Sequence, residues 1–69
     1  MDIRVVIGAN VRRYREQAGL SQEELAFRSE LHRTYVSGVE RGIRNPTVAI
    51  VAKLASALNV PASKLLEYQ

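Results

Sequence analysis

The chain has 69 residues, of which 46% are hydrophobic, so it can form one small domain around a single core. It contains no cysteine, which excludes disulfide bridges and thiolate metal sites. The formal net charge is +3, and eight of the ten cationic residues are arginines that precede residue 45; arginine suits two-pronged contacts to phosphates and guanine edges, although composition alone fits an ordinary solvated surface at least as well.

No segment of the chain is suited to a membrane. The longest apolar run, residues 48–52, has five residues and is too short to span a bilayer. The apolar start at residues 3–7 is interrupted by Arg4, which argues against a signal peptide. We therefore expect a soluble, cytoplasmic protein with no membrane partner.

The apolar periodicity is helical along the chain, with no alternating strand pattern. In the first segment, apolar residues repeat at spacings of four, three and four, at Ile7, Val11, Tyr14 and Ala18. This spacing predicts one buried face of a helix, and Gly19 follows it as a stop.

A second helix is predicted to begin at Ser21. Ser21 and Glu24 have the spacing of a capping box, in which each residue satisfies a backbone N–H of the other. Leu25, Ala26 and Phe27 are expected on its apolar side, and the helix ends near Ser29. A turn of about four residues then leads to the next helix.

The third helix is predicted from residue 32 or 33 to residue 41, and Gly42 stops it. Val36 and Val39 form its inner face. Its outward positions carry Thr34, Ser37, Gly38 and Arg41, with Arg33 on the flank. Such small, polar and guanidinium groups pack poorly, but they suit the major groove of DNA, which admits one helix and offers hydrogen-bonding edges.

Two further helices complete the prediction. Asn45-Pro46 marks a loop, Thr47 caps a fourth helix, and Asn59 ends it in the left-handed conformation. The apolar stripe of this fourth helix contains Val48, Val51, Leu54, Ala55 and Leu58. Pro61 opens a short last helix. The sequence therefore predicts an all-α, compact five-helix bundle that forms one domain over residues 1–69.

A long segment resembles the Cro and phage-repressor helix-turn-helix family: residues 20–46, LSQEELAFRSELHRTYVSGVERGIRNP. Residues 51–66, VAKLASALNVPASKLL, are also similar to that family. Within it, HRTYVSGVERGIRN is most similar to the controller proteins of restriction–modification systems. The resemblance implies a lambda-repressor-like fold with its helix-turn-helix at about residues 21–41. It further implies a homodimeric transcription regulator that binds a palindromic double-stranded DNA operator, needs no cofactor and is not an enzyme.

The resemblance also implies roles for individual residues. Those expected to read base edges are Arg33, Thr34 and Ser37, and the guanidinium of Arg33 is suited to guanine. Those expected to hold the DNA backbone are Gln22, Tyr35, Arg41, Arg44 and Asn45. Gln22 would be helped by the partial positive charge at the amino end of its helix.

The match to this family pairs Arg15 with Glu40. Each residue lies beside the apolar face of its own helix, so both reach the place where the first and third helices pack. We expect a structural ion pair there. Losing one partner of a partly buried pair is costly, because the other charge is left stranded.

Three residues depart from the family pattern. Gly38 stands where a longer, base-reading side chain is frequent, so either the backbone approaches DNA closely there or the position reads nothing. Glu30 replaces a turn glycine, which predicts a slightly strained turn. His32 replaces a serine or threonine, which predicts a weakly capped third helix.

Apolar residues outside the main stripe predict a self-complementary dimer patch: Ile50, Ala57, Leu65 and Tyr68. Two alternatives stay open, an antitoxin-like module that binds a protein partner and the DNA-binding domain of a larger repressor. Activation of transcription would need a further contact with RNA polymerase. No cysteine or carboxylate cluster accompanies His32, the single histidine, so no metal site is predicted.

Overall fold

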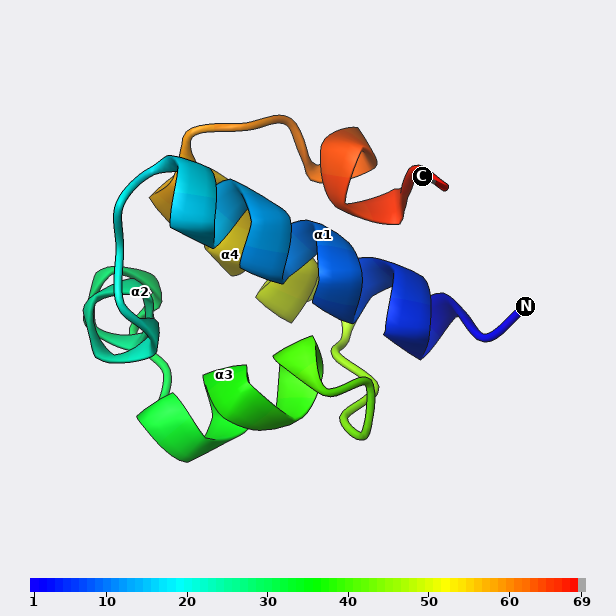
Figure 1. Ribbon diagram of the computed structural model, residues 1–69, viewed down its shortest axis with the longest axis horizontal. Coiled ribbons are helices and arrows are strands. Elements are labelled where there is room, and N and C mark those ends of the chain that lie inside the picture. Colours follow the sequence, from blue (N-terminus) through cyan, green and yellow to red (C-terminus); the bar gives the residue numbers. More distant parts are fainter. Residues whose placement is uncertain (69) are drawn as a thin grey trace.

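The computed structural model describes residues 1–68, and these contain helices and no strand. Its elements are α1 (Ile3–Gln17), α2 (Gln22–Ser29), α3 (Arg33–Glu40), α4 (Val48–Leu58) and the 3-10 helix η1 (Ala62–Leu66). In Figure 1, α1 crosses the molecule between α3 on one side and η1 on the other, with α4 behind it. The all-α prediction is confirmed, and the fifth predicted helix is a single 3-10 segment.

Local side-chain signals fix the ends of several helices. The hydroxyl of Ser21 accepts a hydrogen bond from Glu24 N at 3.0 Å, and Glu24 Oε1 accepts one from Ser21 N at 2.8 Å, which completes the predicted capping box. Thr47 caps α4 by accepting from Ile50 N at 3.2 Å. Asn59 ends α4 at φ 63°, as predicted.

The core lies between α1, α3, α4 and η1, with α2 closing one end. Its largest fully buried apolar side chains are Val11, Leu25, Val36, Val39, Leu54 and Leu65. Leu65 is 0% exposed, so its predicted place in a dimer patch is wrong: η1 turns this side chain inward onto α1 and α4. Burial of these apolar side chains is the main source of stability in so small a chain.

Three other predictions about buried faces are wrong. Ala18 is exposed, because α1 ends at residue 17 and Ala18 is only its C-cap. Phe27 is 85% exposed and Val48 is 88% exposed. Ile50, in the same first turn of α4 as Val48, is half-buried against the core instead.

Asn10 fastens the carboxyl-terminal segment to α1. Its side chain is fully buried, and its amide nitrogen donates to Leu65 O at 2.9 Å and to Glu67 O at 2.8 Å. These two bonds satisfy carbonyl groups at the end of η1. They hold the segment that buries Leu65.

Gly8 lets α1 and α3 approach each other closely. A Cβ atom on Gly8 would meet the carbonyl oxygens of Val39 and Glu40, the latter at 2.8 Å. These oxygens belong to backbone that cannot rotate away. The carboxyl end of α3 is therefore pressed onto α1, and this contact sets where the rest of α3 lies.

Candidate nucleic-acid interface

The helices α2 and α3 are joined by a tight turn with one strained residue. Glu30 has φ 60° and ψ 38°, the left-handed region that glycine adopts more easily. Leu31 N donates to Ala26 O at 2.9 Å, which closes the carboxyl end of α2. The strain predicted for this turn is confirmed, and it directs the chain from α2 into α3.

The amino-terminal half of α3 presents its polar face to solvent. Val36 and Val39 are buried on the inner face, whereas Arg33 and Thr34 are exposed and Ser37 is half-buried. Figure 1 shows α3 on the outside of the molecule, packed along one side only. The outward placement predicted for Arg33 and Thr34 is thus present, at the start of a helix of eight residues.

The amino end of α3 has no side-chain cap. His32 occupies the N-cap position with extended backbone, and its side chain makes no hydrogen bond to the first turn. The weak capping predicted from His32 is confirmed. The N–H groups of the first turn are therefore not satisfied by a cap from this side chain.

A buried ion pair holds the other end of α3. Arg15 Nε lies 2.6 Å from Glu40 Oε2, and Arg15 Nη2 lies 3.0 Å from Glu40 Oε1, a two-pronged contact. The side chains are only 12% and 4% exposed. The predicted pair is confirmed. Hydrogen bonding to Glu40 raises the pKa of Arg15 above its ordinary value, against the opposing effect of desolvation.

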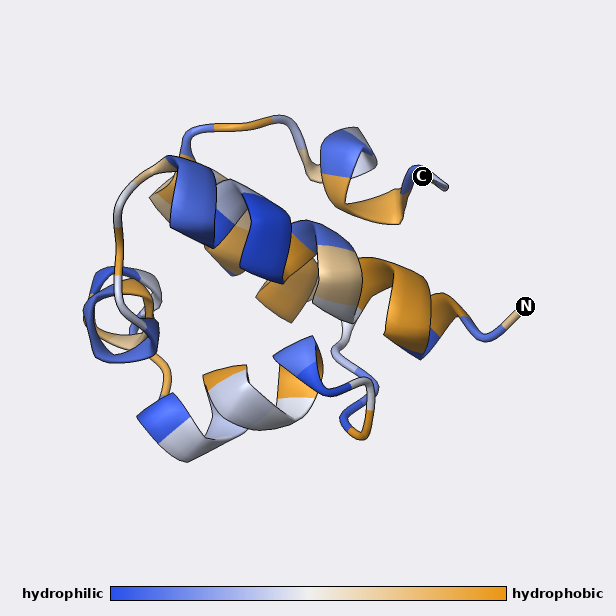
Figure 2. Cartoon of the chain, viewed as in Figure 1, coloured by the Kyte–Doolittle hydropathy of each residue, from blue (hydrophilic) through white to orange (hydrophobic). Residues whose placement is uncertain are grey.

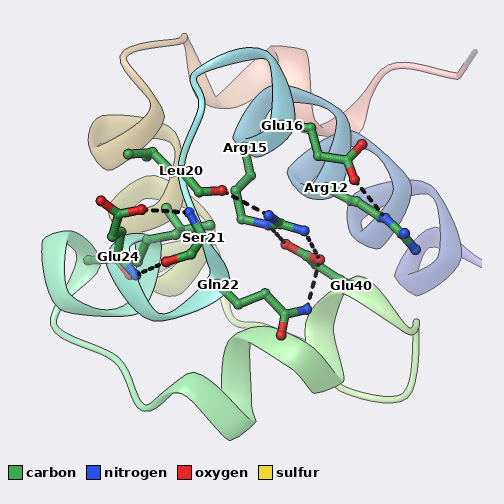
Figure 3. A network of polar contacts seen from close by, with 10 residues as sticks. Arg12, Arg15, Glu16, Leu20, Ser21, Gln22, Glu24 and Glu40 are labelled. Carbon is green, nitrogen blue, oxygen red and sulfur yellow. Dashed lines mark hydrogen bonds and ion pairs between the residues drawn. The ribbon is translucent and has the colours of Figure 1, made fainter.

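Figure 3 shows that this pair is the centre of a larger network. Arg15 Nη1 donates to Leu20 O at 2.8 Å, and Gln22 Nε2 donates to Glu40 Oε1 at 3.0 Å. Gln22 was predicted to hold a DNA phosphate. In the structure its side chain links the start of α2 to the end of α3. The network ties three helices together at one point, so the orientation of α3 against α2 is fixed in the unbound protein.

The loop after α3 folds back onto that helix. Gly38 is buried, and a Cβ atom there would lie 2.7 Å from Arg44 Cγ. The guanidinium carbon of Arg44 lies 5.5 Å from the ring centroid of Tyr35. The prediction that Gly38 faces outward is therefore wrong, because the aliphatic part of Arg44 covers it. Arg41 and Asn45, also predicted to contact phosphates, are exposed in the segment that follows α3.

Comparison with known proteins agrees with this arrangement of helices. Residues 11–65 match the helix-turn-helix family. Control protein C.SmaI of Serratia marcescens is 51% identical over the whole chain and 82% of its own length. The chain belongs to the helix-turn-helix family of DNA-binding transcription regulators. Control protein C.BamHI of Bacillus amyloliquefaciens is 43% identical over 97% of the chain and 84% of its own length.

Solved structures of helix-turn-helix regulators have the same fold. The restriction–modification controller protein C.AhdI of Aeromonas hydrophila superposes with a TM-score of 0.87 and 48% identity, over 90% of this chain and 94% of that one. The hypothetical transcription factor NHTF from Neisseria superposes with a TM-score of 0.92 and 47% identity, over 96% and 76%. This regulator is thus similar to controller proteins in both sequence and structure.

The residues predicted for a dimer patch do not form one exposed surface in this helix-turn-helix chain. Ile50 and Ala57 are half-buried against the core, and Tyr68 is exposed. The structure instead has an apolar groove that the sequence did not reveal. It is lined by the first turns of α1 and α4 and by η1. Its exposed apolar rim is Ile3, Val48 and Leu66. Figure 2 shows the hydrophobic amino end of α1 that contributes to it.

Other kinds of site find little support in residues 1–68. No helix in this range is long and apolar enough to cross a membrane. Within the same range, no three of the histidine and carboxylate side chains are grouped so as to hold a metal ion. The exposed face of α3 and its neighbouring loop are the arrangement that most clearly suits a ligand.

Proposed function

We propose that this chain acts in the bacterial cytoplasm as a homodimeric regulator that binds a palindromic DNA operator, in the manner of a restriction–modification controller protein. The observation that carries the proposal is the exposed polar edge of α3, held in a fixed orientation by the Arg15–Glu40–Gln22 network. A recognition helix must project from the body without moving relative to it. The similarity to C.SmaI, C.BamHI and C.AhdI supports the controller role.

Base reading is assigned to the first half of α3. Arg33 and Thr34 are exposed at its amino end, which is the part of a recognition helix that contacts base edges. The guanidinium of Arg33 can donate two hydrogen bonds to the O6 and N7 atoms of guanine. Ser37 is half-buried one turn later and reaches a base or phosphate only if the helix lies deep in the groove.

Contacts with the DNA backbone are assigned to five residues around the exposed polar edge of α3: Gln22, Tyr35, Arg41, Arg44 and Asn45. Gln22 opens α2, where the helix dipole and the backbone N–H groups favour a phosphate. Its amide nitrogen already donates one bond to Glu40, so a phosphate contact there would also be positioned by the buried network. These contacts contribute affinity that falls as salt rises.

The second copy is expected to cover the apolar groove whose rim is Ile3, Val48 and Leu66. Val48 is 88% exposed and Leu66 is 47% exposed, although both are large apolar side chains. A chain this small gains stability by burying such surface against a copy of itself. Half-site centres would then lie roughly 34 Å, about ten base pairs, apart. Occupying a promoter suffices for repression, while activation requires a further contact with RNA polymerase.

Selection of binding sites from a random duplex library at physiological salt tests the proposal. A palindrome with half-sites about ten base pairs apart is expected. A single unpaired half-site would contradict the dimer and favour the DNA-binding domain of a larger repressor. If nothing is enriched, the operator proposal fails, and an antitoxin-like role with a protein partner becomes the alternative to test.

Two variants, one on the rim of the groove and one outside it, test the dimer separately. Val48→Glu introduces a charge on the rim of the groove, and Glu23→Ala changes an exposed residue of α2 outside it. Sedimentation at micromolar concentration should show the parent and Glu23→Ala as dimers and Val48→Glu as a monomer. A dimeric Val48→Glu variant would place the interface elsewhere.

A further inference from the structure

We propose that Gly38 is a positioning residue for DNA binding: its missing side chain forms a seat that holds Arg44 along α3, ready to contact DNA. The role of Arg44 in DNA binding rests on the proposed function. The seat itself rests only on the structure of the chain without DNA. It replaces the two explanations that the sequence leaves open for a glycine inside a recognition helix, namely close approach of DNA or no role.

The side chain of Arg44 passes directly over Gly38. A Cβ atom at position 38 would lie 2.7 Å from Arg44 Cγ, 3.4 Å from Nε and 3.6 Å from Cδ. Contacts under about 3 Å between carbon atoms are repulsive, since attraction is greatest near 3.5–4.0 Å. Any residue other than glycine would therefore force the Cγ atom of Arg44 to move, whereas Nε and Cδ lie at ordinary van der Waals distance.

The backbone leaves Arg44 no simple way to avoid such a clash. Gly38 O accepts hydrogen bonds from Ile43 N at 3.0 Å and from Arg44 N at 3.3 Å. Gly38 thus anchors the backbone of the loop and also lies beneath the side chain of Arg44. Because Cγ is only two bonds from the anchored Cα atom, a side chain at position 38 must force Arg44 into another rotamer.

Tyr35 forms the second part of the seat. It lies one turn before Gly38, and the Arg44 guanidinium carbon is 5.5 Å from the centroid of its ring, within the range of a cation–π contact. No carboxylate among residues 1–68 forms an ion pair with Arg44. The contact with Tyr35 holds the guanidinium in place. Because Arg44 is an exposed residue, this group remains accessible to an anion.

Holding Arg44 in advance favours binding for an entropic reason. A long side chain loses rotamer freedom when it is immobilised at an interface, and this loss weakens association. An arginine already placed along α3 loses less on binding DNA. Glycine is also a poorer helix former than alanine, so helix stability alone does not account for a glycine at position 38.

A double-mutant cycle on the operator obtained by selection tests the seat. The four proteins are the parent, Gly38→Ala, Arg44→Ala and the double variant. Arg44→Ala should weaken binding roughly tenfold or more, as loss of a charge-assisted hydrogen bond does. Gly38→Ala should lose most of that affinity, and the double variant should bind no more weakly than Arg44→Ala alone.

Two outcomes of the cycle would overturn the proposal. If Gly38→Ala weakens binding by the same factor with and without Arg44, DNA itself approaches the backbone at position 38. If Gly38→Ala binds as the parent does, Arg44 needs no seat. Thermal unfolding is the accompanying control: in the Arg44→Ala background, Gly38→Ala should raise the Tm by about 4–8 °C, since the clash is gone and the helix propensity remains.

A measurement without DNA separates failure of the seat from failure of the proposed function. NMR relaxation of the Arg44 Nε–H group should show an ordered side chain in the parent and a mobile one in Gly38→Ala. The Nε–H group of exposed Arg28 should be mobile in both proteins. A mobile Arg44 in the parent would overturn the seat even if the protein binds its operator. An ordered Arg44 in a protein that selects no duplex would leave the seat intact and overturn the proposed function.

Discussion

The carboxyl end of α3 carries Glu40, whose side chain is 4% exposed and hydrogen-bonded to Arg15 and Gln22. Its amino end carries Arg33 and Thr34, both exposed, and begins at His32 without a side-chain cap. One end of a single eight-residue helix is therefore fixed by buried charge, while the other end lacks a side-chain cap. Fixing the helix at one end keeps the exposed edge in position and leaves its polar groups free for a ligand.

The largest expected effect comes from breaking the fixed end. Glu40→Gln keeps the shape of the side chain but leaves Arg15 as an uncompensated charge that is only 12% exposed. We expect a loss of about 3 kcal/mol in the free energy of unfolding, as for other buried pairs with one partner removed. Urea denaturation measures it. Much of the loss should return in the double variant Arg15→Met/Glu40→Leu, and a loss below 1 kcal/mol would show that the pair is not buried in solution.

At the exposed end, a substitution should change DNA binding and leave stability unaltered. Arg33→Ala is expected to weaken binding by about 1–3 kcal/mol and to relax specificity at one base pair, while the Tm stays unchanged. Lys53→Ala removes the same charge from an exposed position on α4 and is the matched control. Titration of both variants against operator sequences altered at single base pairs would measure the difference. Equal losses for the two variants would mean that Arg33 acts only through its charge.

Local signals in the sequence were sufficient to predict where α2 begins and where α4 begins and ends. The capping box at Ser21 and Glu24 depends only on two residues three positions apart, so a short stretch of sequence is enough to predict it. The pairing of Arg15 with Glu40 was also predictable, because it came from the family resemblance and from the faces of two helices. The strained residue Glu30 was found in the same way.

Burial was predicted less well, because periodicity identifies a helix face but not the elements that cover it. Val48 belongs to the apolar stripe of α4 and is exposed, whereas Ile50, outside the stripe, is half-buried. Leu65 was expected on the surface and is fully buried by the turn that η1 makes onto α1. The cover over Gly38 was hidden for the same reason, since only the path of the following loop brings Arg44 back to it.

Capping the free end should give a smaller, opposite effect. His32 has the extended backbone of an N-cap residue, so serine can replace it without a change of conformation. His32→Ser is expected to stabilise the protein by about 1 kcal/mol, which raises the Tm of a domain this size by about 4–8 °C. Thermal unfolding measures this gain. An unchanged Tm would indicate that the first-turn N–H groups are already well solvated or otherwise bonded.

The smallest effect is expected for an exposed ion pair on α1. It joins an arginine to a glutamate, as the Arg15–Glu40 pair does, but it is not buried. Arg12 lies three residues before Arg15, and its Nε atom is 3.3 Å from Glu16 Oε2, but these side chains are 65% and 58% exposed. Water solvates both charges well, so Arg12→Ala should change the free energy of unfolding by no more than about 0.5 kcal/mol. Urea denaturation of Arg12→Ala beside Glu40→Gln isolates the contribution of burial. A loss for Arg12→Ala as large as that for Glu40→Gln would contradict the view that desolvated charge is what fixes α3.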